Sequence, residues 1–245
     1  MRFDIITIFP NIFDSYIKES ILGRAQKEKR VVIRAHDIRK FSRDKHRKAR
    51  PTGRWSYGRV DDKPYGGGAG MVLQAEPILK AVEMILKKTT KQKVKIVLLS
   101  AKGKQFTQKM AYDWAKKYDQ LILISGRYEG IDERVKTILS ALGGKSDEIS
   151  IGPYVLTDGD AAAMVIVSAV ARLIPGVIAF ESLKEESFFS MLLKAEYPHY
   201  TRPEILKWKD KTYRVPKILL SGDHKKIKKW REKKRKNGGI DILKR

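Results

Sequence analysis

The stretch LILISGRYEGIDER, residues 121–134, decides the fold of this chain. Its first four residues are all apolar, which is typical of a strand buried on both faces of a sheet. The strand runs directly into a loop that contains Gly126 and Gly130, and Asp132 then marks the start of a helical segment. A buried strand that leads through a glycine loop into a helix predicts an α/β fold with a parallel sheet.

The sequence on both sides of this stretch repeats the alternation of strands and helices. A run of Ala, Met and Val after Asp160 predicts a helix that is deeply buried. Apolar strands separated by amphipathic helices favour a parallel sheet covered on both faces. The predicted strands are residues 3–9, 31–33, 94–99 and 121–124, and the predicted helices are residues 12–21, 78–86, 105–117 and 160–173.

The net charge limits the class of partner. Lys and Arg number 52 against 28 Asp and Glu, which gives a formal net charge of +24. This excess favours a nucleic acid, because each neutralised phosphate releases condensed counterions; a generally basic proteome is the competing interpretation. Cysteine is absent, which excludes disulfides and thiolate catalysis. The sequence has no apolar run of membrane-spanning length and no signal peptide, so we expect a cytoplasmic protein with no membrane partner.

The character of the chain changes after Pro175-Gly176. Residues 181–186 form a charged connector without an apolar period, and the basic sequence beyond it predicts short helices. Nine of the twelve residues between Lys225 and Lys236 are Lys or Arg, with Trp230 among them. A solvated helical face is one interpretation of this run, but its density favours contact with nucleic acid.

A glycine cluster at residues 65–70, YGGGAG, raises the question of a nucleotide-binding loop. The spacing is not that of a P-loop, and a Rossmann loop requires a buried strand directly before it. The preceding residues, 59–64, are RVDDKP and cannot form such a strand. A backbone that passes close to a ligand or to another chain explains the glycines better.

Three loops are stronger candidates for a ligand site: two are expected at the ends of parallel strands, and the third leads into the predicted buried helix. They are residues 98–103, 125–134 and 150–159. Ligands of parallel sheets collect outside the carboxyl ends of the strands. Arg127, Tyr128 and Glu129 add a charge pair and an aromatic face to the second loop; an ordinary strand-to-helix turn is the alternative. The three loops could converge on one small ligand.

Six blocks of sequence resemble the bacterial tRNA (guanine-N1)-methyltransferase family, TrmD. They follow one another over nearly the whole chain, and six ordered blocks are specific where the glycine cluster alone is weak. The blocks are DDKPYGGGAGMV at 61–72, GRYEGIDERV at 126–135, SIGPYVLTDGD at 150–160, RLIPGV at 172–177, PHYTRP at 198–203 and VPKILLSGDH at 215–224.

The resemblance implies a SPOUT fold, in which an α/β parallel sheet carries a deep C-terminal trefoil knot. It implies a knotted S-adenosylmethionine-binding domain at residues 1–178, a flexible linker at 179–186 and a small, mostly helical, basic tRNA-binding domain at 187–245. It also implies a homodimer with active sites between subunits. The implied cofactor-binding residues are Ser100, Ala101, Gly126, Tyr128, Glu129, Ile151, Gly152, Pro153, Tyr154, Val155, Leu156 and Gly159.

The implied reaction is methyl transfer from S-adenosylmethionine to N1 of the guanosine immediately 3′ of the anticodon, position 37 of tRNA. That nitrogen is protonated, so the transfer needs a base within hydrogen-bond reach. Negative charge then develops on the neighbouring carbonyl oxygen and calls for a cationic donor. By the resemblance the base is Glu186 and the donor is Arg172; composition alone would make Glu186 a solvated linker charge.

The histidines show no metal-ligand spacing, so no transition-metal site is predicted. The resemblance implies Mg²⁺ as an optional second cofactor, with Glu129 the carboxylate nearest the site. Two other function classes stay open beside the family reaction. One is a basic RNA-binding or ribosome-associated scaffold, and the other is a SPOUT enzyme that acts on a 2′-hydroxyl or on ribosomal RNA.

The chain departs from the family pattern near its proposed site. The position of the proposed general base still carries a carboxylate, Glu186, but its side chain is one methylene longer than the aspartate of the family pattern. The neighbouring Glu185 is an alternative candidate for the general base. An insertion at residues 50–58 adds Arg54, Trp55 and Tyr57, a composition that suits phosphate contacts and base stacking. The substituted positions are Glu186 for Asp, Ala101 for Pro, Pro153 for Asp, Asp158 for Gly and Asp160 for Glu.

Overall fold

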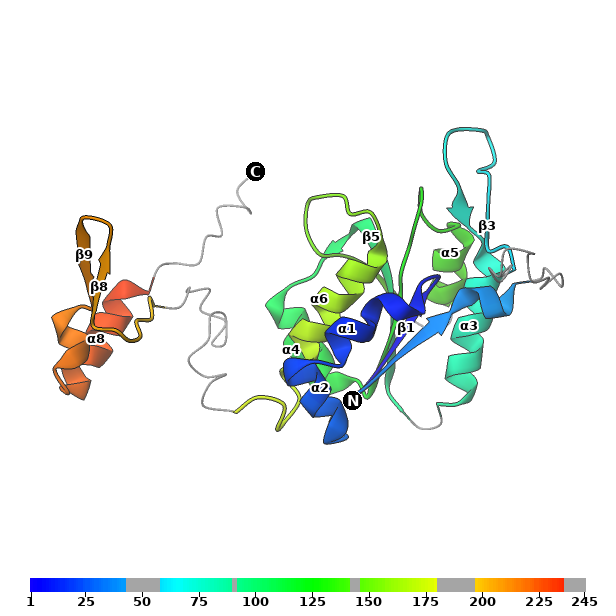
Figure 1. Cartoon of the computed structure of the whole chain (residues 1–245). Coiled ribbons are helices and arrows are strands. Elements are labelled where there is room, and N and C mark those ends of the chain that lie inside the picture. Colours follow the sequence, from blue (N-terminus) through cyan, green and yellow to red (C-terminus); the bar gives the residue numbers. More distant parts are fainter. Residues whose placement is uncertain (43–57, 90–91, 142–145, 180–196, 236–245) are drawn as a thin grey trace. The chain divides into compact units, whose positions relative to one another are not determined.

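The computed structural model of the chain describes residues 1–42, 58–89, 92–141, 146–179 and 197–235 (Figure 1). Its contacts divide the chain into two units, Met1–Ile178 and Ala179–Arg245. The strands of the first unit are β1 (Arg2–Thr7), β2 (Val32–Asp37), β3 (Asp61–Asp62), β4 (Val72–Leu73), β5 (Val94–Gln105), β6 (Gln120–Ile124) and β7 (Ser146–Ser150). Its helices are η1 (Pro10–Phe13), α1 (Asp14–Ile17), α2 (Ser20–Lys27), η2 (Ile38–Phe41), α3 (Ala75–Lys87), α4 (Gln108–Lys117), α5 (Arg134–Ala141) and α6 (Gly159–Ala171).

The first unit is built on a five-stranded sheet of order β2-β1-β6-β5-β7, in which every neighbouring pair is parallel. β6 lies at the centre, and all five of its residues are buried. The sequence prediction of a parallel α/β sheet is therefore confirmed. Because all five strands run the same way, the loops after β5, β6 and β7 leave from one edge of the sheet.

Helices cover both faces of the sheet, as the apolar strands predict (Figure 1). One core packs α1, α2, α4 and α6 against residues such as Phe3, Leu121 and Leu123. The other packs α3 and α5 against residues such as Ile6, Ile122 and Ile124. Successive strand residues thus enter opposite cores, which accounts for the unbroken apolar run in β6.

The predicted buried helix at 160–173 is α6, and its apolar residues include the fully buried Ala163, Ile166 and Val170. Three strands of the first unit were not predicted. β7 carries Ser146, Asp147 and Glu148, a polar composition that gives no apolar signal for a strand. β3 and β4 have two residues each, and they pair antiparallel on either side of the glycine cluster. The cluster is thus the tip of a ribbon and not the end of a buried strand.

The described part of the second unit contains a hairpin of β8 (Ile205–Trp208) and β9 (Lys211–Arg214), followed by η3 (Lys217–Leu220) and α8 (His224–Lys234). The sequence analysis predicts short helices here and misses the hairpin. All eight hairpin residues are exposed, and α8 has no buried residue. No helix of the described ranges has the length and the apolar composition needed to cross a membrane.

A buried carboxylate in β1 organises the amino-terminal half of the sheet. Asp4 is fully buried and accepts hydrogen bonds from Arg2 Nη2 at 2.7 Å and Gln120 Nε2 at 2.6 Å, while His36 Nε2 lies 2.6 Å from its Oδ1. Burial by itself raises the pKa of Asp4, but the hydrogen bonds and charges of His36 and Arg2 outweigh it and hold the pKa below its usual value. Asp4 thus joins β1, β2 and β6 as an ionised group.

We predict that Asp4→Asn lowers the free energy of unfolding by about 3 kcal/mol at neutral pH, because it leaves the cationic partners uncompensated in the interior. The folded-state pKa of Asp4 is depressed, so its contribution is present above the unfolded value of about 3.9 and is lost as the pH falls through the folded value. Urea unfolding at several pH values should therefore show the difference between wild type and variant shrinking below pH of about 4. Asp14→Asn, which opens an exposed ion pair with Lys18, is the control and should change stability by less than about 1 kcal/mol. Equal stability of Asp4→Asn and wild type at neutral pH would contradict the prediction.

Candidate active site

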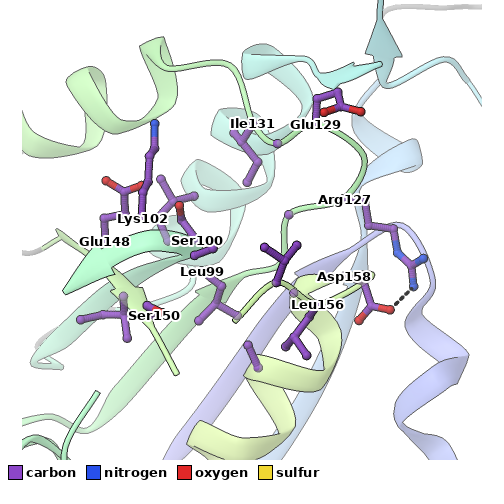
Figure 2. A pocket seen from close by; sticks show the side chains of 18 of the residues that line it. Leu99, Ser100, Lys102, Arg127, Glu129, Ile131, Glu148, Ser150, Leu156 and Asp158 are labelled. Atoms are coloured by element: carbon purple, nitrogen blue, oxygen red, sulfur yellow. Dashed lines mark ion pairs between the residues drawn. The ribbon is translucent and has the colours of Figure 1, made fainter. Parts of the chain in front are cut away.

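A cavity of about 450 Å³ lies at the carboxyl ends of β5, β6 and β7 (Figure 2). Three segments enclose it: residues 98–102 within β5, residues 126–133 after β6, and residues 148–159, which lead from the end of β7 into α6. These are the three loops that the sequence analysis expects to converge on one ligand. Sites for small molecules usually measure about 300–1,000 Å³, so the cavity can hold one small organic ligand.

The second and third segments are held together by direct backbone contact. The Gly159 N–H donates to the carbonyl of Gly126 at 2.8 Å. A Cβ atom added to Gly159 would lie 2.8 Å from Gly126 N and 3.0 Å from Ser125 Cα. A larger residue therefore cannot occupy position 159 without separating α6 from the end of β6, and glycine is required here by packing.

The third segment folds on itself before it reaches α6. Ser150 Oγ donates to the carbonyl of Gly152 at 2.8 Å, and the Tyr154 ring packs directly against the Gly152 backbone. Beyond this turn Val155 is 87% exposed and Leu156 40% exposed. Apolar side chains this exposed at the mouth of a cavity favour a ligand that covers them.

A cluster of ion pairs joins the second segment to the third and to the start of α6. Arg127 Nη2 donates to Asp160 Oδ2 at 2.9 Å and lies 3.4 Å from Asp158 Oδ2 (Figure 2). Asp158 also caps α6, since its Oδ1 accepts from the N–H groups of Asp160 and Ala161. The Arg127 guanidinium stacks on the ring of Phe9, 4.4 Å from its centroid. We call Arg127, Asp158 and Asp160 the clamp.

The opposite rim of the cavity carries a second set of ion pairs. The hydrogen bond from Arg134 lowers the pKa of Asp132, and the hydrogen bond from Lys102 at 2.8 Å lowers that of Glu133. Both carboxylates therefore stay ionised at neutral pH. Glu148 on β7 lies deeper, with one oxygen 2.7 Å from Lys136 Nζ.

The structure brings most of the predicted cofactor residues to the wall of this one cavity. Gly152 and Pro153 belong to the same segment without lining the cavity itself. The predicted residues that line it are Ser100, Ala101, Gly126, Tyr128, Glu129, Ile151, Tyr154, Val155, Leu156 and Gly159.

The two predicted catalytic residues are placed differently. Arg172 follows the last residue of α6, about 20 Å along the helix from Gly159 at 1.5 Å per residue. The cavity lies at the first turn of α6, so Arg172 is at the far end of the same helix. Glu186, the linker 179–186 beyond Ala179 and the insertion residues Arg54, Trp55 and Tyr57 lie outside the described residues.

Several residues of the wall were not predicted as site residues. Lys102 lines the cavity from β5, Glu133 from the position just before α5, and Glu148 from β7. Little in the sequence indicated that they belong to a site, because charged residues near strand ends are common on protein surfaces and β7 itself was not predicted. Among the described residues, no group of three or more His, Cys, Asp or Glu is arranged to hold a metal ion.

The geometry defines a parallel α/β protein with a cavity at its strand ends, lined by apolar and charged side chains and by three glycines, Gly126, Gly130 and Gly159. Comparison with known proteins specifies the class. The family described as tRNA (Guanine-1)-methyltransferase TrmD matches residues 1–240. The chain belongs to this family, as the six sequence blocks predict.

Relatives carrying the name tRNA (guanine-N(1)-)-methyltransferase align over most of their own length. The relative from Carboxydothermus hydrogenoformans is 47% identical over 95% of this chain and 82% of its own. Those from Chloroflexus aggregans and Thermomicrobium roseum are 48% and 49% identical, over 96% and 94% of this chain and 83% and 77% of their own. Identity at this level extends over both units described above.

We predict that Asp158→Ala raises the dissociation constant of the ligand of this cavity about tenfold, because it removes the α6 cap and one carboxylate of the clamp. Asp158→Asn keeps a capping oxygen but loses the charge facing Arg127, so it should have an intermediate effect. Isothermal titration with S-adenosylmethionine would measure both. Asp113→Asn on α4, an exposed ion-paired carboxylate outside the cavity, is the matched control. Wild-type affinity in Asp158→Ala would show that the clamp does not shape the site.

Proposed function

We propose that this chain transfers a methyl group from S-adenosylmethionine to N1 of the guanosine at position 37 of tRNA, with a carboxylate as general base. The chain is a tRNA (guanine-N1)-methyltransferase of the TrmD family. The cavity is the main observation in support of the methyl donor and the reaction. It is lined by three segments, and the family resemblance assigns cofactor-binding residues to each of them. The position of the guanosine in the tRNA, the methyl donor and the general base are inferences from the family chemistry.

The cavity fits S-adenosylmethionine in size and in chemistry. Its volume of about 450 Å³ suits a molecule of this size, and its wall combines apolar side chains such as Leu99 and Leu156 with Gly126, which has no side chain. Leu99, Ile151 and Leu156 would pack on the adenine ring, and backbone groups of residues 151–156 would hydrogen-bond its edge. When bound, the cofactor supplies a methyl group already activated by its sulfonium.

The protein's part is then to position the guanine and to manage one proton. Glu186 would accept the proton from N1, and Arg172 would stabilise the negative charge that develops on the neighbouring carbonyl oxygen. Because Arg172 lies at the opposite end of α6 from the cavity, one subunit alone does not bring it to its own cofactor. A second copy that packs against α6 would supply it.

The exposed apolar surface of the first unit supports a homodimer with active sites between subunits. Phe9, Ile12 and Tyr16, which lie in and just before η1 and α1, are 42–44% exposed, and Val165 on α6 is 46% exposed. η1 packs directly against α6, so these side chains belong to neighbouring elements. A grouping of large apolar side chains on a highly charged protein favours burial against another chain.

We propose further that residues 1–178 form a trefoil knot. Support comes from the course of residues 151–159, which pass against residues 125–127 and pair Asp158 with Arg127 in a short antiparallel bridge. A deep knot would hold residues 125–127 and 151–159 against each other. A site formed between these two segments depends on their staying in contact.

Residues 187–245 are proposed as the tRNA-binding domain, joined by a flexible linker at 179–186. In its described part α8 is dominated by Lys and Arg, and its Trp230 lies 6.4 Å from Tyr200 between ring centroids. Cationic side chains with interleaved aromatics bind phosphates and stack on bases. The protein's place of action would be the cytoplasm, where unmodified tRNA is available; Mg²⁺, coordinated through Glu129, is proposed as an accessory ion.

Methyl transfer to two tRNA transcripts tests the proposed function. We expect labelled methyl groups from S-adenosylmethionine to enter an unmodified transcript with guanosine at position 37, and a transcript with adenosine there to receive none above background. Incorporation into both transcripts would contradict the proposal that the guanine at position 37 is the methylated nucleobase. Cofactor binding without incorporation into either would favour an RNA-binding scaffold or another RNA target.

Replacement of the proposed base separates chemistry from binding. Glu186→Gln keeps the size of the side chain and removes the proton acceptor, so we expect single-turnover methylation to fall at least about 100-fold, the scale of general-base catalysis. Binding of S-adenosylmethionine should stay within about twofold, because residue 186 lies outside the cofactor segments. Glu185→Gln is the matched control; a larger loss in this variant than in Glu186→Gln would transfer the role to Glu185.

A further inference from the structure

The glycine cluster that the sequence analysis singled out is not used by the proposed cofactor site. It forms the tip of the β3–β4 ribbon, which stands clear of the sheet in Figure 1. Gly66, Gly67, Gly68 and Gly70 all have φ between +81° and +114°, a region that favours glycine. Tyr65, at the start of the tip, is 100% exposed.

One of these glycines is explained by the packing of the chain. A Cβ atom added to Gly70 would lie 2.5 Å from Glu129 Oε1 and 2.6 Å from its Cγ. By contrast, nothing among the described residues lies within 4 Å of a Cβ atom at Gly66 or Gly67. Within the part of the chain that the structure describes, their bare backbone therefore faces open space beside the fully exposed ring of Tyr65.

The ribbon stands directly on the second segment of the cavity wall. The Glu129 N–H donates to the carbonyl of Met71 at 3.1 Å, and Leu73 exchanges backbone hydrogen bonds of 3.0 Å with Gly130 and Asp132. Leu73 is fully buried and anchors the base of the ribbon in the core. Whatever binds at the tip is thus held beside the loop that lines the cofactor cavity.

We propose that the ribbon tip, residues 63–68, is a contact surface for the tRNA substrate, in which Tyr65 stacks on a nucleobase and the bare backbone of Gly66 and Gly67 admits the RNA chain. This proposal rests on the proposed function, since it places the RNA beside the methyl donor. Base–aromatic stacking tolerates any base because every base has a π-face. Glycine backbone allows close approach and leaves its N–H groups available to phosphate oxygens.

The surroundings of Tyr65 favour RNA over a protein partner. Arg134 forms an ion pair with Asp132, and the Asp132 N–H donates to the carbonyl of Leu73 at the base of the ribbon, so a cation lies beside the segment that supports the tip. Lys63 forms no ion pair with the described residues and adds a second cation. The glycines offer little apolar area to a second protein chain, and the exposed apolar side chains that suit a dimer lie on η1, α1 and α6.

Direct binding of tRNA to the full-length protein tests the proposal. The probe is a fluorescently labelled, unmodified tRNA transcript, titrated with wild type and with Tyr65→Ala, Tyr65→Phe and Tyr65→Trp in the presence of S-adenosylhomocysteine. We expect Tyr65→Ala to raise the dissociation constant about 10-fold, within the range for loss of one stacked base. Tyr65→Phe and Tyr65→Trp should stay within about threefold of wild type, because both keep a ring.

A second variant tests the bare backbone separately. Gly67→Asn adds a side chain of a type that tolerates left-handed backbone, so a loss of tRNA binding reports obstruction and not strain. We expect a rise of about fivefold or more in the dissociation constant for tRNA, the scale of one lost interaction of 1 kcal/mol. Binding of S-adenosylmethionine and the subunit mass in sedimentation should match wild type in all variants.

Three results would overturn the proposal. The first is tRNA affinity of Tyr65→Ala within twofold of wild type. The second is loss of cofactor affinity in Tyr65→Ala, which would make the tip a support of the cavity. The third is a shift in subunit mass, which would assign the tip to a contact between copies of the chain. Because the readout is binding, it stays informative even if the wild type methylates a nucleotide other than guanosine 37.

Discussion

The cavity at the strand ends depends on the backbone contact between the first residue of α6 and the loop that follows β6. Gly159 donates to Gly126 at 2.8 Å, and no side chain fits between them. This contact brings the loop after β7 over the ends of β5 and β6, and it fixes where α6 begins. Without it the third segment would have no wall to close against, and the cavity would be an open strand edge.

Charge reinforces this contact. Arg127 leaves the end of β6 and meets Asp158 and Asp160 at the start of α6, with the ring of Phe9 on its other face. Asp158 also caps α6, so one carboxylate both starts the helix and pairs with Arg127. The segment after β6 supports the β3–β4 ribbon on its outer side, so the wall of the cavity and the proposed RNA contact share one segment.

The sequence was sufficient for the parts of the fold that apolar burial determines. The central strand at 121–124 and the buried helix beginning near Asp160 were predicted, and the sequence also pointed to the three loops that meet at the cavity. β7 was missed because Ser146, Asp147 and Glu148 pair through backbone atoms at the sheet edge and need no apolar side chains. The β8–β9 hairpin was missed because its residues are exposed and highly charged, which leaves no alternation to detect.

The candidate site, too, could be predicted only in part. Positions such as Gly126 and Ile151 could be predicted from the sequence blocks, since a loop keeps its course when its glycines are kept. The clamp could not be derived, because Arg127 and Asp158 are 31 positions apart and meet only through the packing of α6 on β6. The distance between Arg172 and the cavity likewise follows from the length of α6, because the cavity lies at the first turn of this helix and Arg172 lies beyond its last. The proposed role of Arg172 therefore requires a second subunit.

A crystal structure of the protein with S-adenosylmethionine would show where the proposed cofactor binds. We predict electron density for it in the cavity between residues 98–102, 126–133 and 148–159, with its adenine ring against Leu99 and Leu156. Density at the glycine tip, residues 65–70, or at any place outside these three segments would contradict this prediction.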